Sequence, residues 1–60
     1  EPAQIKKIRE ASRVSQAVFA ALLNTSVSTV QKWEIGQKRP TGTALKLLYL
    51  VQERGLKAVA

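Results

Sequence analysis

A short helix predicted over residues 27–34 has one face free of apolar and acidic side chains. At 100° per residue, Val27, Val30 and Trp33 fall on one side of this helix, and small polar groups and one cation fall almost opposite. Hydroxyl, carboxamide and ammonium groups can bond base edges, and a valine side chain can meet a thymine methyl group. The alternative is an ordinary solvated helix face. The candidates for base contact in a DNA major groove are Val27, Ser28, Thr29, Gln31 and Lys32.

The composition limits the class of protein. Sixty residues allow a single domain, residues 1–60, and a net charge of +6 indicates an anionic partner. The sequence has no Cys or His, and its four acidic residues are scattered glutamates, so we expect no enzyme activity, no metal site and no cofactor. No apolar run approaches the roughly 20 residues that span a bilayer, so no membrane partner is expected. Because the sequence begins with Glu1 rather than Met, we expect a fragment or a processed product.

Capping residues divide the chain into helices. Pro2 suits the first position of a helix that runs to about residue 11, and Ser15 suits the N-cap of a second helix to about residue 23. Asn24 can end that helix in the left-handed conformation, and Ser26 caps the helix over 27–34. Thr41 can cap a last helix that Gly55 ends. With no strand pattern, the chain is predicted to be all-α, with four to five helices.

The apolar positions predict which sides of these helices face the core. In the second helix we expect four inward residues, and we expect Trp33 to pack inward alongside Val30 and Ile35. A role for Trp33 as a base-stacking platform is the less favoured alternative. The four inward residues of the second helix are Val18, Phe19, Leu22 and Leu23.

Residues 16–36 resemble the helix-turn-helix of phage-repressor-like (Cro/cI, XRE-type) regulators, with the motif at about 16–34. Gln16 opens the motif, Ala20 is the small residue at the helix crossing, and Val30 is the buried aliphatic residue of the recognition helix. The stretches 29–36 and 40–45 look most like the HigA-type antitoxins. The resemblance implies a compact lambda-repressor-like DNA-binding domain. Asn24 departs from the pattern, which has Gly there.

Residues outside the recognition helix are candidates for contact with DNA phosphates. The resemblance implies such a contact for the carboxamide of Gln16. Lys38, Arg39 and Thr41 follow the recognition helix directly, where they would hold the backbone without reading sequence. The alternative for each is a solvated surface residue.

Arg9 and Glu34 match the positions of a partly buried ion pair in phage repressors of this family. Arg9 lies next to Ile5 on the inward side of the first helix, and Glu34 falls on the Val30 side of the third. We therefore expect a structural pair across these two helices and no DNA contact from Arg9.

The last helix, between Thr41 and Gly55, carries apolar side chains around more of its circumference than a single core-facing stripe would need. Excess apolar surface on a small domain is typical of an interface, so we expect a homodimer whose two recognition helices meet a palindromic operator about 34 Å apart. The alternative is a tail that folds back and closes a monomer core. The expected dimer contacts are Tyr49, Leu50, Leu56 and Val59.

These features predict sequence-specific binding of double-stranded DNA by a repressor. Resemblance to the HigA-type branch adds an antitoxin that autoregulates its toxin–antitoxin operon, with an RNA-cleaving toxin as partner, in the bacterial cytoplasm and on the nucleoid when bound. The alternative is a protein-interaction module that binds a toxin or another regulator without operator specificity. A basic membrane-surface peptide fits less well, because Gly36, Pro40 and Gly55 interrupt any long helix.

Overall fold

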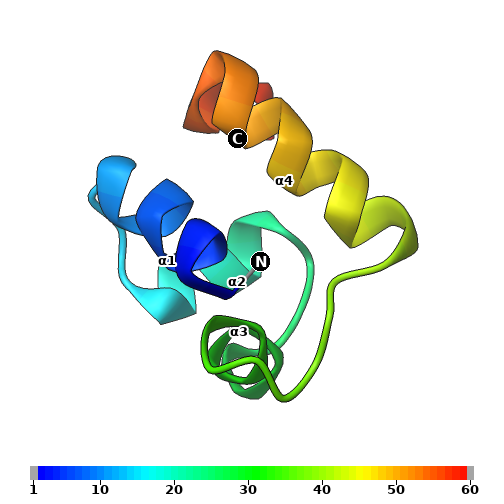
Figure 1. Cartoon of the computed structure of the whole chain (residues 1–60). Helices are drawn as coiled ribbons and strands as arrows, with labels where there is room; N and C mark the ends of the chain where they lie inside the picture. Colours follow the sequence, from blue (N-terminus) through cyan, green and yellow to red (C-terminus); the bar gives the residue numbers. More distant parts are fainter. Residues whose placement is uncertain (1, 60) are drawn as a thin grey trace.

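A computed structural model describes residues 2–59, so Glu1 and Ala60 lie outside the described residues. The described part is all-α (Figure 1). It consists of α1 (Pro2–Ala11), α2 (Gln16–Leu22), α3 (Val27–Glu34), α4 (Gly42–Arg54) and a 3-10 turn, η1 (Leu56–Ala58). No helix within residues 2–59 has the length and apolarity that crossing a membrane requires.

Side-chain caps determine where the two middle helices begin. The Ser15 hydroxyl accepts a hydrogen bond from the Val18 backbone N–H, and the Ser26 hydroxyl accepts one from the Thr29 N–H, both at 3.1 Å. Asn24 adopts the left-handed conformation, with φ at 56°, between these helices. Only the four residues 23–26 connect α2 to α3, and two helices joined by such a short turn form a helix-turn-helix.

The start of α4 differs from the expected cap. Thr41 occupies the N-cap position, but its side chain makes no capping hydrogen bond. Gly42 follows with a φ of 56°, so the chain enters α4 through a left-handed glycine. Gly55, with φ at 80°, ends α4 as predicted.

A single core holds the four helices together. Phe19 from α2 and Val30 from α3 are completely buried. Six further buried residues pack with them: one from α1, one from α2, one at the C-cap of α2, one from α3 and two from α4. Val14, in the turn between α1 and α2, also packs against this core. The buried set is Ile5, Phe19, Ala20, Leu23, Val30, Trp33, Leu48 and Val51.

Two residues expected inside are exposed. Val18 is 47% exposed because it lies in the first turn of a seven-residue helix, at the margin of the core. Ile35 is 67% exposed because it is the C-cap of α3, where the chain has left the helix and the 100° projection no longer applies. Trp33 is buried as predicted, at 3% exposure.

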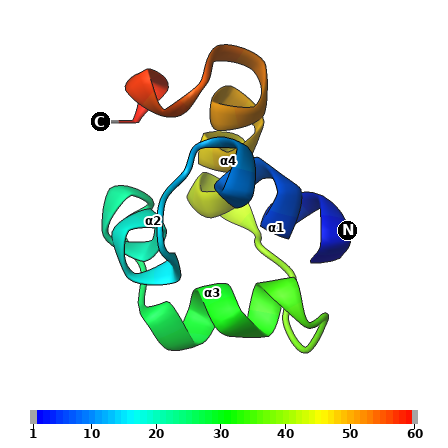
Figure 2. The ribbon, with the colours of Figure 1, turned by 90° about the vertical axis from the view of Figure 1, so that its left-hand side faces the viewer.

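The helices are arranged so that α3 forms one side of the molecule. In Figures 1 and 2, α3 runs along the lower edge, α4 lies at the opposite side, and α1 and α2 lie between them. The inner side of α3 packs against α1 and α2. Its outer side is covered by no other described segment.

Candidate nucleic-acid interface

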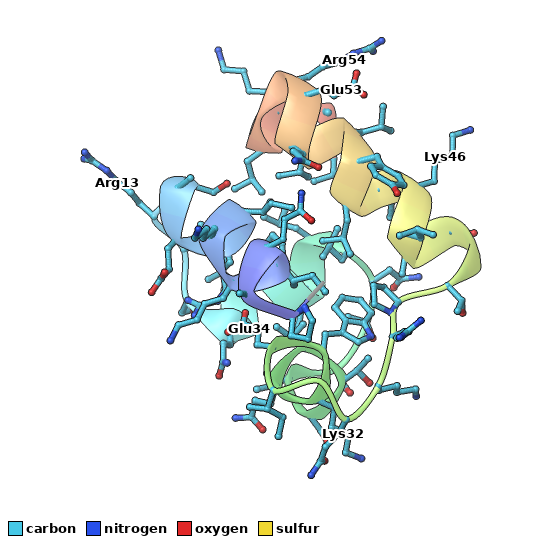
Figure 3. All side chains as sticks on the ribbon, in the orientation of Figure 1. Arg13, Lys32, Glu34, Lys46, Glu53 and Arg54 are labelled. Carbon is cyan, nitrogen blue, oxygen red and sulfur yellow. The ribbon has the colours of Figure 1, made fainter. Side chains whose placement is uncertain are left out.

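The outer face of α3 presents the polar side chains singled out from the sequence. Ser28, Gln31 and Lys32 are exposed, and Val27 is 38% exposed at the beginning of the helix. Figure 3 shows Lys32 pointing away from the body of the molecule, whereas Glu34 lies back toward α1 and α2. A short rigid helix with this exposed face has the shape and the functional groups that a major groove accommodates.

Thr29, the fifth candidate for base contact, is half-buried and already has a hydrogen-bond partner. Its hydroxyl lies 2.9 Å from the Ser26 hydroxyl, which also accepts from the Thr29 backbone N–H. The two side chains therefore close the first turn of α3 and fix the end of the helix that would enter the groove. Base contact by Thr29 remains a prediction, and it requires the hydroxyl to keep or exchange this bond.

The basic loop after α3 is fastened to the end of that helix. The backbone N–H groups of Gln37 and Lys38 both donate to the Lys32 carbonyl, at 2.9 and 3.3 Å. Gly36 has a φ of 82°, and a Cβ built there would lie 3.2 Å from Pro2 Cγ, so a glycine suits this turn. These contacts hold the loop against α3, and the phosphate candidates Lys38, Arg39 and Thr41 are all exposed.

Arg9 and Glu34 form a two-bond ion pair between α1 and α3. Arg9 Nε donates to Glu34 Oε2 at 2.6 Å, and Arg9 Nη2 donates to Glu34 Oε1 at 3.1 Å. Arg9 Nη1 also donates to the Val14 carbonyl at 3.1 Å. The side chains are 14% and 4% exposed. This pair therefore joins the first helix, the following turn and the recognition helix.

The ion pair shifts the pKa of both groups in the direction that favours their charged forms. Burial acts to raise the pKa of Glu34, but hydrogen bonds from Arg9 and Gln16 and the charges of Arg9 and Lys6 outweigh it, so this pKa is lowered. The hydrogen bond to Glu34 raises the pKa of Arg9 against the opposing effect of burial. Glu34 is therefore ionised at neutral pH and accepts hydrogen bonds only.

Gln16 belongs to the same network, which the sequence did not predict. Its Nε2 donates to Glu34 Oε1 at 3.2 Å, and the residue is half-buried at the start of α2. Gln16, Glu34 and Arg9 border one open groove. The contact joins residues 18 positions apart on different helices, so no local pattern could reveal it.

The apolar surface of α4 is only partly covered by the tail. Leu56 and Val59 are half-buried against the core of their own chain, so the tail does fold back. It leaves Tyr49 57% exposed and Leu45, one turn earlier, 38% exposed, while Leu50 is half-buried. Of the four expected dimer contacts, Tyr49 is the one with most of its surface available.

Comparison with known proteins agrees with this geometry. A helix-turn-helix family model matches residues 5–48. The chain is 49% identical over 51 residues to "Antitoxin HigA-2" of Vibrio cholerae serotype O1, a match that covers 85% of this chain. The chain spans about half the length of this curated relative, 49%. The chain therefore belongs to the helix-turn-helix family, in its phage-repressor-like (XRE-type) branch, and is a DNA-binding regulatory domain rather than an enzyme.

Proposed function

We propose that this chain is the operator-binding domain of an antitoxin that represses its own toxin–antitoxin operon. The observation that carries the proposal is the outer face of α3, where Ser28, Gln31 and Lys32 are exposed while the inner face is packed in the core. The likeness to "Antitoxin HigA-2" supports the antitoxin part. Repression would follow from occupancy of an operator that overlaps a promoter, with no chemical step.

Base recognition is assigned to the outer face of α3. Gln31 can pair with adenine through two hydrogen bonds, and Lys32 can donate to guanine O6 or N7. Ser28 suits either a base edge or a phosphate, and Val27 suits a thymine methyl group. Thr29 contributes by holding the first turn of the helix in place.

Phosphate contacts are assigned to Gln16, which contacts the last residue of α3, and to Lys38, Arg39 and Thr41 in the loop that follows α3. Such contacts position a helix without reading sequence. For a dimer that neutralises about six to ten phosphates, affinity falls by about 10³ to 10⁵ between 50 and 200 mM salt.

The operator complex is proposed to contain two copies of the chain. Tyr49 and Leu45 are one turn apart on α4 and both expose apolar surface. Pairing through this surface, with contributions from Leu50 and the tail residues Leu56 and Val59, would direct two recognition helices to half-sites about 34 Å apart on a palindrome. An RNA-cleaving toxin is the further partner proposed for the whole protein, which would act in the bacterial cytoplasm and bind the nucleoid through its operator.

Selection of duplexes from a random library tests this function. The protein is compared at near-physiological salt with Gln31→Ala, Lys32→Ala and the control Lys46→Ala, which removes a cation from the exposed side of α4. Enrichment of a palindrome by the parent and the control, with altered base preference in the two α3 variants, supports the proposal. Weak binding to every duplex without enrichment contradicts it.

A protein-interaction module without operator specificity is the second candidate function. The exposed Tyr49 and Leu45 favour it, because an apolar patch of this kind suits a protein partner. Lys32 and the neighbouring basic loop argue against it, since they give α3 a cationic surface suited to DNA. The duplex selection separates the two functions, because a module without operator specificity would enrich no sequence, whereas weaker association in Tyr49→Ser is expected of both.

A further inference from the structure

The contact between Gln16 and Glu34 determines which end of the Gln16 carboxamide faces Glu34, and this orientation matters for phosphate binding. A phosphate oxygen only accepts hydrogen bonds, so Gln16 must present an N–H group, not its carbonyl oxygen. On an unconstrained surface glutamine the two ends of the carboxamide exchange freely. Here the ionised Glu34 also only accepts, so it selects the orientation in which Nε2 faces it at 3.2 Å.

This orientation leaves one donor of Gln16 unused by Glu34. A carboxamide nitrogen carries two N–H bonds that diverge from each other. When one donates to Glu34 Oε1, the other is directed elsewhere, on a residue that borders an open groove at the start of α2. The contact therefore fixes which end of the carboxamide faces Glu34 and keeps a second donor on the same nitrogen.

Glu34 can fix Gln16 because Glu34 is itself held in place. Its two carboxylate oxygens accept from Arg9 Nε and Nη2, and its side chain is only 4% exposed. Arg9 is in turn anchored to the Val14 carbonyl. A carboxylate with so little rotational freedom pre-organises its third partner, which reduces the conformational entropy lost when that partner binds a ligand.

We propose that Glu34 is a positioning residue for DNA binding, which orients the Gln16 carboxamide so that its second N–H donates to a phosphate. This inference rests on the proposed function and deepens it. The Arg9–Glu34 pair then has two roles: it stabilises the fold and it prepares a phosphate contact on the adjacent helix. An acidic residue, which by charge alone would repel DNA, thereby strengthens binding.

A double-mutant cycle separates positioning from charge and from stability. Glu34→Gln, Gln16→Ala and the double variant are compared in their affinity for one duplex at 10 °C, where circular dichroism checks that each protein is folded. Glu34→Gln keeps the shape of the side chain but replaces one acceptor by a donor, so either end of Gln16 can then face it. Glu53→Gln is the control, because it removes the same charge at an exposed position on α4, far from the network (Figure 3).

We expect Gln16→Ala to weaken binding about tenfold, and Glu34→Gln to weaken it about threefold relative to Glu53→Gln. In the Gln16→Ala background, Glu34→Gln and Glu53→Gln should then have the same affinity. An equal loss from Glu34→Gln with and without Gln16, or no loss relative to the control, overturns the proposal. If the parent protein does not bind the duplex, both this proposal and the proposed function are wrong.

If Glu34→Gln does not fold, a measurement on the unmodified protein tests whether Glu34 orients the Gln16 carboxamide. In the NMR spectrum, one side-chain amide proton of Gln16 should exchange slowly with water in the free protein, and the other should shift when the duplex is added. Rapid exchange of both protons, or no shift of the second in a protein that binds the duplex, overturns the positioning role and leaves the operator-binding function standing.

Discussion

Truncation of Glu34 to alanine should strongly destabilise this domain, because it breaks the ion pair with Arg9. The substitution removes the acceptors of two hydrogen bonds from Arg9, at 2.6 and 3.1 Å, and of one from Gln16 at 3.2 Å. Arg9 keeps only the Val14 carbonyl as a partner. A guanidinium group whose side chain is 14% exposed then loses its hydrogen-bonded counter-charge.

The expected loss is about 2–3 kcal/mol. Breaking a fully buried ion pair by removal of one partner costs about 3–5 kcal/mol, because a charge is left buried and unpaired. The groove beside Arg9 and Gln16 is open, so water can reach the stranded guanidinium and reduce this cost. For a domain of this size, 1 kcal/mol corresponds to about 8 °C in Tm, so the predicted decrease is about 15–25 °C.

Thermal unfolding followed by circular dichroism measures the decrease. Glu53→Ala, which removes an exposed glutamate from α4, is the matched control and should change stability by less than about 0.5 kcal/mol. Replacing both partners, as Arg9→Met with Glu34→Leu, should recover part of the lost stability. An unchanged Tm for Glu34→Ala would show that the pair with Arg9 does not stabilise the fold.

Three further predictions concern acid stability, capping and salt dependence. The folded-state pKa of Glu34 is lowered, so ionised Glu34 stabilises the fold above the unfolded-state pKa of about 4.3, and this stabilisation is lost as the pH falls through the folded-state pKa. In urea unfolding between pH 5 and 3, the free energy of unfolding should therefore decrease more steeply for the parent than for Glu34→Gln. Ser26→Ala should cost about 1 kcal/mol in urea unfolding, because the Thr29 N–H and hydroxyl lose their partner, and an unchanged midpoint would contradict this. Lys38→Ala should reduce the slope of log affinity against log salt by about one per subunit, whereas Lys46→Ala should not, and equal slopes would argue against the loop after α3 as a phosphate contact.

The helix boundaries could be predicted because capping is a local property. Ser15, Ser26, Asn24 and Gly55 each act within a few residues of their own position, and the structure places each at the helix end where it was expected. Thr41 shows the limit of this reasoning, since a residue type suited to capping occupied the right position and made no capping bond.

The contacts between helices were predicted only where a family pattern was available. The resemblance to phage repressors predicted that Arg9 and Glu34 pair, and the structure places them within hydrogen-bonding distance. Gln16 was assigned to DNA alone, because nothing in the spacing of residues 16 and 34 indicates that two different helices bring them together. Val18 and Ile35 were placed inside because helical periodicity says nothing about how close a residue lies to the end of its helix or to the margin of the core.

An NMR titration of the ¹⁵N-labelled domain with duplex DNA tests most directly whether the outer face of α3 is the DNA-binding surface. We expect the largest shifts at Ser28, Gln31 and Lys32 and in the loop after α3, and little change around Lys46 and Arg54 on α4. Shifts centred on α4, or spread evenly over all exposed cations, would show that α3 is not the DNA-binding surface.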